Sequence, residues 1–220
     1  MTLIRVAIDG PAGAGKSTTA KLLARRLRYI YVDTGAMYRT LTLSAIEENL
    51  DPKNETVLSK RLHELNIRLT SDGKTYIGER DVTEDIRLPA VDALVSIVCA
   101  HPMVRREMVR RQREMAEAGG VVMEGRDIGT VVIPDAELKL FITARPDIRA
   151  ERRSRQLIAG GIEVDLEKLE QEIIKRDELD STRENSPLKQ AEAAILIDTS
   201  DMPLMEVVDK VEKLAREKGA

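Results

Sequence analysis

Short runs of apolar residues alternate along the chain with longer stretches in which apolar and polar residues follow helical spacing. The short runs are rich in β-branched residues and predict buried strands at residues 3–8, 29–32, 121–123, 138–142 and 194–197. The longer stretches predict helices at residues 16–28, 36–49, 90–100, 102–118, 147–159, 165–184 and 204–218. This alternation predicts an α/β fold, in which a parallel sheet carries helices on both faces.

Residues 66–87 follow a different pattern. The turn Ser71-Asp72-Gly73 lies between two β-like pieces, which predicts a small antiparallel insert. A chain of 220 residues suffices for one large domain. We therefore expect a single domain, with the region 60–90 as its one candidate subdomain.

Composition and charge narrow the class of protein. The chain is 42% hydrophobic and 33% charged, which is typical of a soluble globular protein. Its 35 basic and 38 acidic residues give a net charge of −3. This balance argues against a general nucleic-acid binder, although it leaves room for a local basic cleft.

Cysteine usage and the N-terminal segment bear on the compartment. A single cysteine, Cys99, excludes a disulfide framework within the chain, and no Cys/His cluster suggests zinc. The segment MTLIRVAIDG lacks the apolar core of a signal peptide because Asp9 interrupts it. No stretch approaches the ~20 apolar residues of a membrane span. We expect a cytoplasmic protein that does not bind membranes.

The turn after the first predicted strand carries the most specific motif. It matches G-x-x-x-x-G-K-S/T between a strand and a helix, as a phosphate-binding loop requires. The predicted ATP contacts are Gly10, Pro11, Ala12, Gly13, Ala14, Gly15, Lys16, Ser17 and Thr18. Glycines let backbone N–H groups approach phosphate oxygens, Lys16 adds a cation at the β- and γ-phosphates, and the Ser17 hydroxyl is a ligand for Mg²⁺.

Three classes of nucleotide-binding protein share such a loop. A GTPase would carry an Asn-Lys-x-Asp segment, and none is present. A mechanical ATPase would show an apolar strand that ends in aspartate, whereas the strand at 121–123 is followed by Glu124. A small-molecule kinase requires a second, arginine-rich site for a phosphorylated acceptor.

Residues that suit such a second site follow the second predicted strand. Asp33 lies at its carboxyl end, where ligands of open α/β sheets bind, so we expect it in the Mg²⁺ shell through water. Arg39 follows in the next helix and is placed to contact an acceptor phosphate. The alternative is a capped helix start followed by a surface arginine.

The stretch GGVVMEGRDIGTVVIPD, residues 119–135, places charged residues between two apolar runs. Arg126 and Asp127 follow the strand at 121–123 and so lie on the same rim of the sheet. Arg126 is a candidate for binding the acceptor phosphate, and Asp127 for accepting a hydrogen bond from an amino group. The alternative is that these two residues form an ion pair with each other.

Two charged helices complete the candidate site. Arg149, Arg152 and Arg153 fall within about one turn, and Gly160-Gly161 follows as a possible hinge. They are typical either of a lid that closes over the transferring phosphoryl group or of a solvated face.

In the next helix, Arg176, Asp180 and Arg183 are spaced four and three residues apart and share one face. Asp180 suits ribose hydroxyls, and the two arginines suit sugar or phosphate. A salt-bridged solvent helix is the alternative.

Several motifs together resemble the bacterial-type cytidylate kinases of the nucleoside monophosphate kinase family. They are IDGPAGAGKST at 8–18, DTGAMYR at 33–39, the stretch 96–113, GRDIGTVV at 125–132 and RDELDSTRENSPL at 176–188. The insert near 60–90 resembles the extended monophosphate-binding region of this family. The motifs occur in family order over most of the chain.

The resemblance implies one phosphate-loop kinase domain with a core of about 1–35, 90–145 and 185–220, a monophosphate-binding region of about 36–90 and a lid of about 147–165. It implies transfer of the γ-phosphate of ATP to CMP or dCMP with Mg²⁺, by a monomer that binds small molecules rather than nucleic acid. The implied acceptor contacts are Thr34, Tyr38, Arg39, Ser96, Arg105, Arg126, Asp127, Arg176, Asp180 and Arg183. The implied catalytic residues are Lys16, Arg126, Arg149, Arg152 and Arg153, with Ser17 and Asp33 at the metal.

The chain departs from the family pattern in two places. Thr34 stands where serine is common, and the segment ELDST at 178–182 is less basic than in some relatives.

The chemistry of cytosine fits three of these residues. Its amino group requires an acceptor such as Asp127, and its N3 and O2 require donors such as Arg105 and Ser96. Uracil would leave buried groups unpaired. A kinase for UMP, dTMP or shikimate, or an RNA-binding module that uses the basic helix, remains an alternative.

Overall fold

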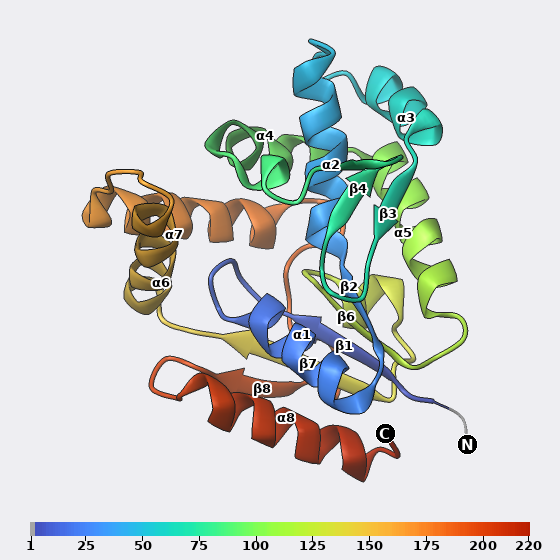
Figure 1. Ribbon diagram of the computed structural model, residues 1–220, viewed down its shortest axis with the longest axis vertical. Coiled ribbons are helices and arrows are strands. Elements are labelled where there is room, and N and C mark those ends of the chain that lie inside the picture. The colour runs from blue at the N-terminus through green and yellow to red at the C-terminus, as the bar shows by residue number, and fades with distance from the viewer. Residues whose placement is uncertain (1–2) are drawn as a thin grey trace.

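A parallel sheet forms the centre of the computed structural model, which describes residues 3–220 (Figure 1). Its five strands lie in the order β2-β6-β1-β7-β8. Their bounds are Arg5–Asp9 for β1, Ile30–Asp33 for β2, Val121–Gly125 for β6, Leu138–Thr143 for β7 and Ile195–Asp198 for β8. The predicted parallel sheet is confirmed, with strand ends within two residues of those expected.

Helices cover both faces of this sheet, as predicted. The α-helices of residues 3–220 are α1 (Lys16–Leu27), α2 (Thr34–Glu47), α3 (Glu55–Glu64), α4 (Pro89–Ala100), α5 (Pro102–Ala116), α6 (Pro146–Ala159), α7 (Leu166–Thr182) and α8 (Leu204–Glu217). Helices α1 and α8 pack on one face of the sheet and α5 on the other, whereas α3, α4, α6 and α7 pack mainly on other helices. Strand β6 shows the two faces: Val122 packs into the core with α1 and α8, whereas Val121 and Met123 pack with Ala116 of α5. Successive side chains point to opposite faces because the strand has a period of two.

The predicted insert is a three-stranded antiparallel sheet in the order β3-β4-β5, with bounds Ile67–Leu69, Thr75–Ile77 and Arg80–Asp81. It has one strand more than the two pieces expected. Helix α3, which precedes it, was not predicted. Its signals are a capping Asn54, whose side chain accepts a hydrogen bond from Val57 N, and the buried pair Leu58 and Leu62.

The second apolar run of the stretch 119–135 is not extended. Residues Ile128–Val132 form one π-helical turn, in which Val132 N donates to Asp127 O at 3.2 Å and Ile133 N donates to Ile128 O at 2.8 Å. The buried Asp9 carboxylate at the end of β1 accepts from Ile128 N and Gly129 N, both at 2.8 Å. The Asp9 carboxylate thereby fixes the turn that directly follows Arg126 and Asp127. Burial raises the pKa of Asp9 to about 6.

Helices α6 and α7 lie side by side at one edge of the molecule (Figure 1). Gly160 and Gly161 connect α6 to the segment before α7, and Gly161 has a φ of +78°. None of the helices formed by residues 3–220 combines the length and apolar character that a membrane crossing requires.

Candidate active site

One cavity of about 1190 Å³ opens where the carboxyl ends of β1, β2 and β6 meet, and it reaches across to α4, α6 and α7. The predicted site residues on its wall are Ala12, Gly13, Ala14, Gly15, Lys16, Ser17, Thr18, Asp33, Thr34, Tyr38, Arg39, Ser96, Arg105, Arg126, Asp127, Arg152, Arg153, Arg176, Asp180 and Arg183. Three other predicted residues, Gly10, Pro11 and Arg149, do not line it. Segments that are distant in sequence thus meet around one space.

The phosphate cradle owes its shape to glycines. Gly10 has a φ of +143°, and a Cβ atom there would lie 1.9 Å from the Ile142 carbonyl oxygen. Gly13 and Gly15 have φ values of +75° and +91°, in the left-handed region that favours glycine. Helix α1 begins directly afterwards at Lys16, so its N-terminal N–H groups face the cradle.

Lys16 is buried against this loop, and its Nζ donates to Pro11 O at 2.7 Å. Burial, helped by the nearby Arg126 guanidinium, lowers the pKa of the Lys16 ammonium to about 7. The Glu124 carboxylate acts in the opposite direction. A group of anionic phosphates in the cradle would restore the charged form, because it would supply the missing counter-charge.

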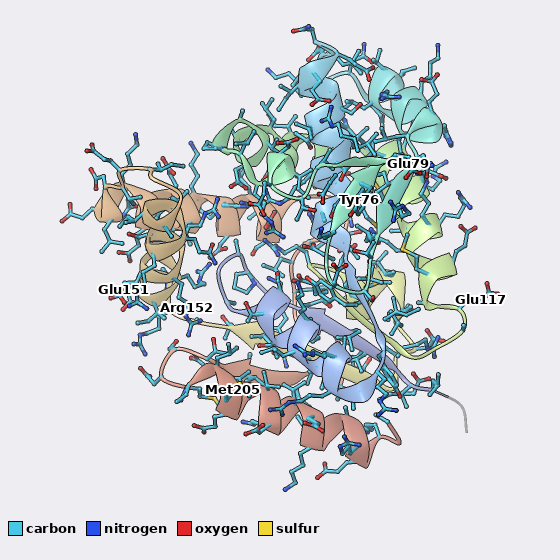
Figure 2. The ribbon with its side chains drawn as sticks, in the orientation of Figure 1. Tyr76, Glu79, Glu117, Glu151, Arg152 and Met205 are labelled. Atoms are coloured by element: carbon cyan, nitrogen blue, oxygen red, sulfur yellow. The ribbon has the colours of Figure 1, made fainter. Side chains whose placement is uncertain are left out.

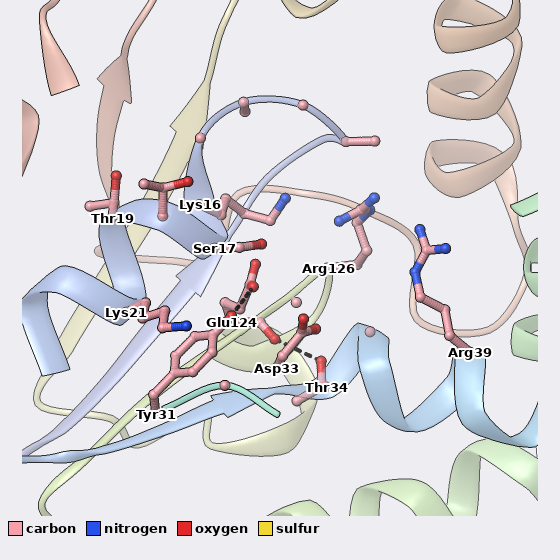
Figure 3. A pocket seen from close by; sticks show the side chains of 18 of the residues that line it. Lys16, Ser17, Thr19, Lys21, Tyr31, Asp33, Thr34, Arg39, Glu124 and Arg126 are labelled. Atoms are coloured by element: carbon pink, nitrogen blue, oxygen red, sulfur yellow. Dashed lines mark hydrogen bonds between the residues drawn. The ribbon is translucent and has the colours of Figure 1, made fainter. Parts of the chain in front are cut away.

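Ser17, Asp33 and Glu124 face the same space beside Lys16 (Figure 3). Asp33 also caps α2 by accepting from Ala36 N at 2.9 Å, which is why this helix begins two residues before its predicted start. Glu124 is buried and accepts from Tyr31 Oη at 2.9 Å. Burial, and then the neighbouring Asp33, raises the pKa of the Glu124 carboxyl.

These groups fit Mg²⁺ better than a metal that needs a full protein cage. Residues 3–220 contain no group of three or more His, Cys, Asp or Glu side chains placed to hold a metal ion. A hydroxyl and two carboxylates are hard oxygen donors, and Mg²⁺ bound with a nucleotide takes most of its ligands from water and phosphate. Glu124 lies beside Ser17 and Asp33, the two residues predicted at the metal, but was not itself predicted. Its position at the end of a predicted strand was the sequence signal that could have identified it.

Arg126 and Asp127 do not pair with each other. Arg126 Nε donates to Asp180 Oδ2 at 2.8 Å, whereas Asp127 forms a buried ion pair with Arg105. Gly125 allows the close approach of Thr34, because a Cβ at Gly125 would lie 2.6 Å from Thr34 Oγ1. Arg126 and Asp127 therefore have different partners at the wall of the cavity.

Asp127 and Arg105 lie at the inner end of the cavity beside Tyr38, Ser96 and Cys99. The Arg105 guanidinium lies 5.7 Å from the centre of the Tyr38 ring, and its Nη1 donates to Cys99 O at 3.3 Å. Burial raises the pKa of the Cys99 thiol to about 11, so this side chain is neutral at neutral pH. The pocket thus combines an aromatic face, a carboxylate and two donors.

An arginine cluster around Asp92 forms another part of the cavity wall. Arg39 and Arg176 both contact Oδ1 of Asp92, at 2.6 and 3.4 Å, and Arg153 contacts Oδ2 at 2.6 Å. Asp92 was not predicted, because an acidic residue in the first turn of a helix is also explained by the helix dipole.

Two buried donors of the site, Arg176 Nε and Arg183 Nη2, have no hydrogen-bond partner within the described part of the chain. Unpaired buried donors are rare, and both arginines line the cavity.

The three arginines of α6 have different partners and do not form one surface. Arg149 is buried, and it donates to Ala144 O at 2.9 Å and to Ala12 O at 3.1 Å. Arg152 instead reaches Thr199, with Nη1 to Oγ1 at 3.0 Å and Nη2 to the carbonyl oxygen at 2.7 Å. Of the three arginines predicted for a lid, Arg152 and Arg153 line the cavity and Arg149 does not. Arg149 lies one turn earlier, where α6 packs against the cradle.

The fold and the cradle define the class as a phosphate-loop kinase. The solved shikimate kinase from Acinetobacter baumannii, in complex with shikimate, is 14% identical, with a TM-score of 0.52 over 99% of this chain and 96% of that chain. An uncharacterized protein from Eubacterium ventriosum gives a TM-score of 0.54 at 14% identity, over 97% and 98% of the two chains. At these identities the likeness shows the fold alone.

The family follows from sequence. The model of the cytidylate kinase family matches residues 6–217, and the chain belongs to this family. It is 51% identical over 211 residues to cytidylate kinases of Bacillus cereus strain B4264 and Bacillus thuringiensis strain Al Hakam, which covers 94% of this chain and of each relative. The expected family is confirmed, and the chain is a nucleotide kinase, a phosphotransferase.

Proposed function

We propose that this chain transfers the γ-phosphoryl group of ATP to CMP or dCMP, giving ADP and CDP or dCDP. The observation that carries the proposal is one cavity whose wall includes the phosphate cradle, Arg126 and the Asp127–Arg105 ion pair. The relatives named above carry the same activity in their names.

The donor end is assigned to the cradle and its surroundings. Residues 10–18 would hold the phosphates of ATP, with Lys16 at the β- and γ-phosphates. Ser17 and Asp33, joined by Glu124, would hold Mg²⁺, which neutralises charge on the β- and γ-phosphate oxygens when bound. Arg149 would support the cradle from behind through Ala12 O.

The acceptor end is assigned to the inner pocket and the arginine cluster. Asp127 would accept from the cytosine amino group, while Arg105 and Ser96 would donate to N3 and O2. Tyr38 would pack against the base, Asp180 would accept from ribose, and the acceptor phosphate would lie among Arg39, Arg126, Arg176 and Arg183. Thr34 donates its hydroxyl to Glu124 O at 2.7 Å, so its role would be to fix the start of α2.

Transfer in this arrangement would need positioning and charge stabilisation rather than a general base. The nucleophile is a phosphate oxygen that is already anionic near neutral pH, and it would attack the γ-phosphorus in line as the bond to ADP breaks. Arg126 lines the same cavity and is close enough to Lys16 to lower its pKa. It would face the transferring group together with Arg152 and Arg153.

Closure of the segment at about 147–165 would exclude water from the site, with the Gly160–Gly161 link as the hinge. In this proposal the region at about 36–90 binds the monophosphate, and the rest of the chain is the core. We expect a monomer that works in the cytoplasm on small molecules.

An acceptor panel tests the proposal. ADP release from ATP should rise with CMP and dCMP, and much less with UMP, dTMP or shikimate. Stimulation by UMP without stimulation by CMP or dCMP would refute the assignment. Binding of RNA with a steep salt dependence, and no acceptor-dependent turnover, would favour a nucleotide-regulated RNA-binding module instead.

A further inference from the structure

Asp92 is the only carboxylate that contacts three arginines from three different helices in the described part of the chain. It lies on α4 and contacts Arg39 of α2, Arg176 of α7 and Arg153 of α6. About a fifth of its side chain is exposed, at 22%. The contacts therefore occur at the wall of the cavity rather than on the open surface.

The contacts of Asp92 are of the kind that arginines make with an anionic ligand. Oδ1 accepts from the guanidinium groups of both Arg39 and Arg176, and Oδ2 accepts from Arg153. Guanidinium groups bind phosphate oxygens by the same charge-assisted hydrogen bonds. All three arginines line the cavity that also includes the cradle.

Arginines outnumber the carboxylate that they share at Asp92. The guanidinium groups of Arg39, Arg153 and Arg176 all contact this one carboxylate, whereas Arg126 pairs with Asp180 and also lies near Glu124 and Asp177. Within residues 3–220, Arg176 Nε has no hydrogen-bond partner. Three guanidinium groups on one carboxylate leave an excess of positive charge, which favours the binding of a phosphate.

We propose that Asp92 is a positioning residue that stands in for the acceptor phosphate, and that it gives up the arginines when the acceptor binds. This inference rests on the proposed function. Without acceptor, Asp92 keeps like-charged guanidinium groups of three helices together. When the acceptor dianion binds, Arg39 and Arg176 exchange their contacts with Asp92 Oδ1 for contacts with phosphate oxygens, and Arg153 leaves Oδ2 in the same way. The phosphates carry more negative charge than one carboxylate and therefore bind the arginines more strongly.

A carboxylate that competes with phosphate for the arginines differs in one measurable way from one that only holds them in place: its removal strengthens phosphate binding. Asp92→Asn keeps the shape but removes the negative charge that opposes an incoming anion. Inorganic phosphate should then bind roughly tenfold more tightly to the variant without nucleotide, as measured by calorimetry. The KM for CMP should fall severalfold while the KM for ATP stays within about twofold, and kcat should fall because the arginines are less well ordered.

Asp201→Asn is the matched control. Asp201 pairs with Arg145 at 2.9 Å outside the cavity and is 81% exposed, so this variant should bind phosphate and CMP as the parent chain does. Weaker or unchanged phosphate binding by the Asp92 variant would overturn the proposal, because it would show that Asp92 only holds the arginines in place and does not compete with phosphate.

A measurement on the unaltered chain covers the case in which the variant does not fold. The carboxyl carbon resonance of Asp92 should shift as inorganic phosphate is added and should saturate with the affinity seen by calorimetry. A resonance that does not move would also overturn the proposal. The calorimetric and resonance titrations with inorganic phosphate use no nucleotide, so absence of CMP-dependent ADP release would refute the proposed function separately.

Discussion

Asp127→Asn is the substitution that tests base recognition most directly. Asp127 is 6% exposed and Arg105 is 5% exposed, so their ion pair is shielded from water. The asparagine carbonyl can still accept from Arg105, but the amide lacks the negative charge that the cytosine amino group and the guanidinium both favour.

The expected magnitude follows from the loss of a hydrogen bond to a charged group. Such a bond contributes about 1.5–3 kcal/mol, and each factor of ten in rate corresponds to about 1.4 kcal/mol. The kcat/KM for CMP should therefore fall roughly 10- to 150-fold. UMP should lose little or gain, because the new amide can donate to uracil O4.

The assay is coupled ADP release at saturating ATP with CMP and UMP varied, together with the KM for ATP and the thermal unfolding of each variant. The free energy of unfolding should fall by about 1–3 kcal/mol, since the charge of Arg105 loses its counter-charge. Asp135→Asn is the control, because Asp135 also pairs with an arginine but is 72% exposed. An unchanged ratio of CMP to UMP turnover, or equal losses for CMP and ATP, would show that Asp127 is structural.

Three further predictions concern the donor site and the insert. Burial lowers the pKa of Lys16 to about 7, and bound phosphates favour its charged form, so ATP binding should take up close to one proton at about pH 8 and should weaken as pH rises. Calorimetry in buffers of different ionisation enthalpy measures this proton uptake. Binding without proton uptake would contradict a buried lysine that is neutral at pH 8. Gly10→Ala should destabilise the fold by more than about 3 kcal/mol, because its Cβ would overlap the Ile142 carbonyl oxygen; urea unfolding close to that of the parent chain would disprove the steric argument. Asn54→Ala should cost about 1 kcal/mol by uncapping α3, and Asn54→Asp should restore it; equal stability of the two variants would show that the cap contributes nothing.

Local pattern gave much of the fold, for identifiable reasons. The strand at 121–123 was predicted because three apolar residues lay between turn signals, and β6 is buried throughout. Helix α3 was missed because its apolar positions are few and its capping asparagine follows an Asp-Pro turn that ended the previous helix. The charged turn after β6 was not predicted, because the carboxylate that fixes it, Asp9, is 119 residues away from Ile128.

The same division applies to the candidate site, of which Figure 3 shows the part around Lys16 and Figure 2 shows Arg152 on α6. Sequence motifs selected residues that in most cases line the cavity. They could not assign partners: the Arg126–Asp127 pair was a local hypothesis, whereas the actual contacts, Asp180 and Arg105, come from α7 and α5. Helical spacing also placed Arg149 with Arg152 and Arg153, although packing against the cradle buries it.

The sequence by itself determined the parallel α/β architecture, the phosphate cradle and the family, because each depends on residue types at short, regular spacing. Only the tertiary structure decided which charges meet, and thereby showed Asp92 among three arginines and Glu124 beside Ser17 and Asp33. The physical reason is that a charged side chain is stabilised by any opposite charge within a few ångströms, whatever its distance along the chain. Residue type and spacing therefore select candidates for a charged site, and the packing of the helices decides their partners.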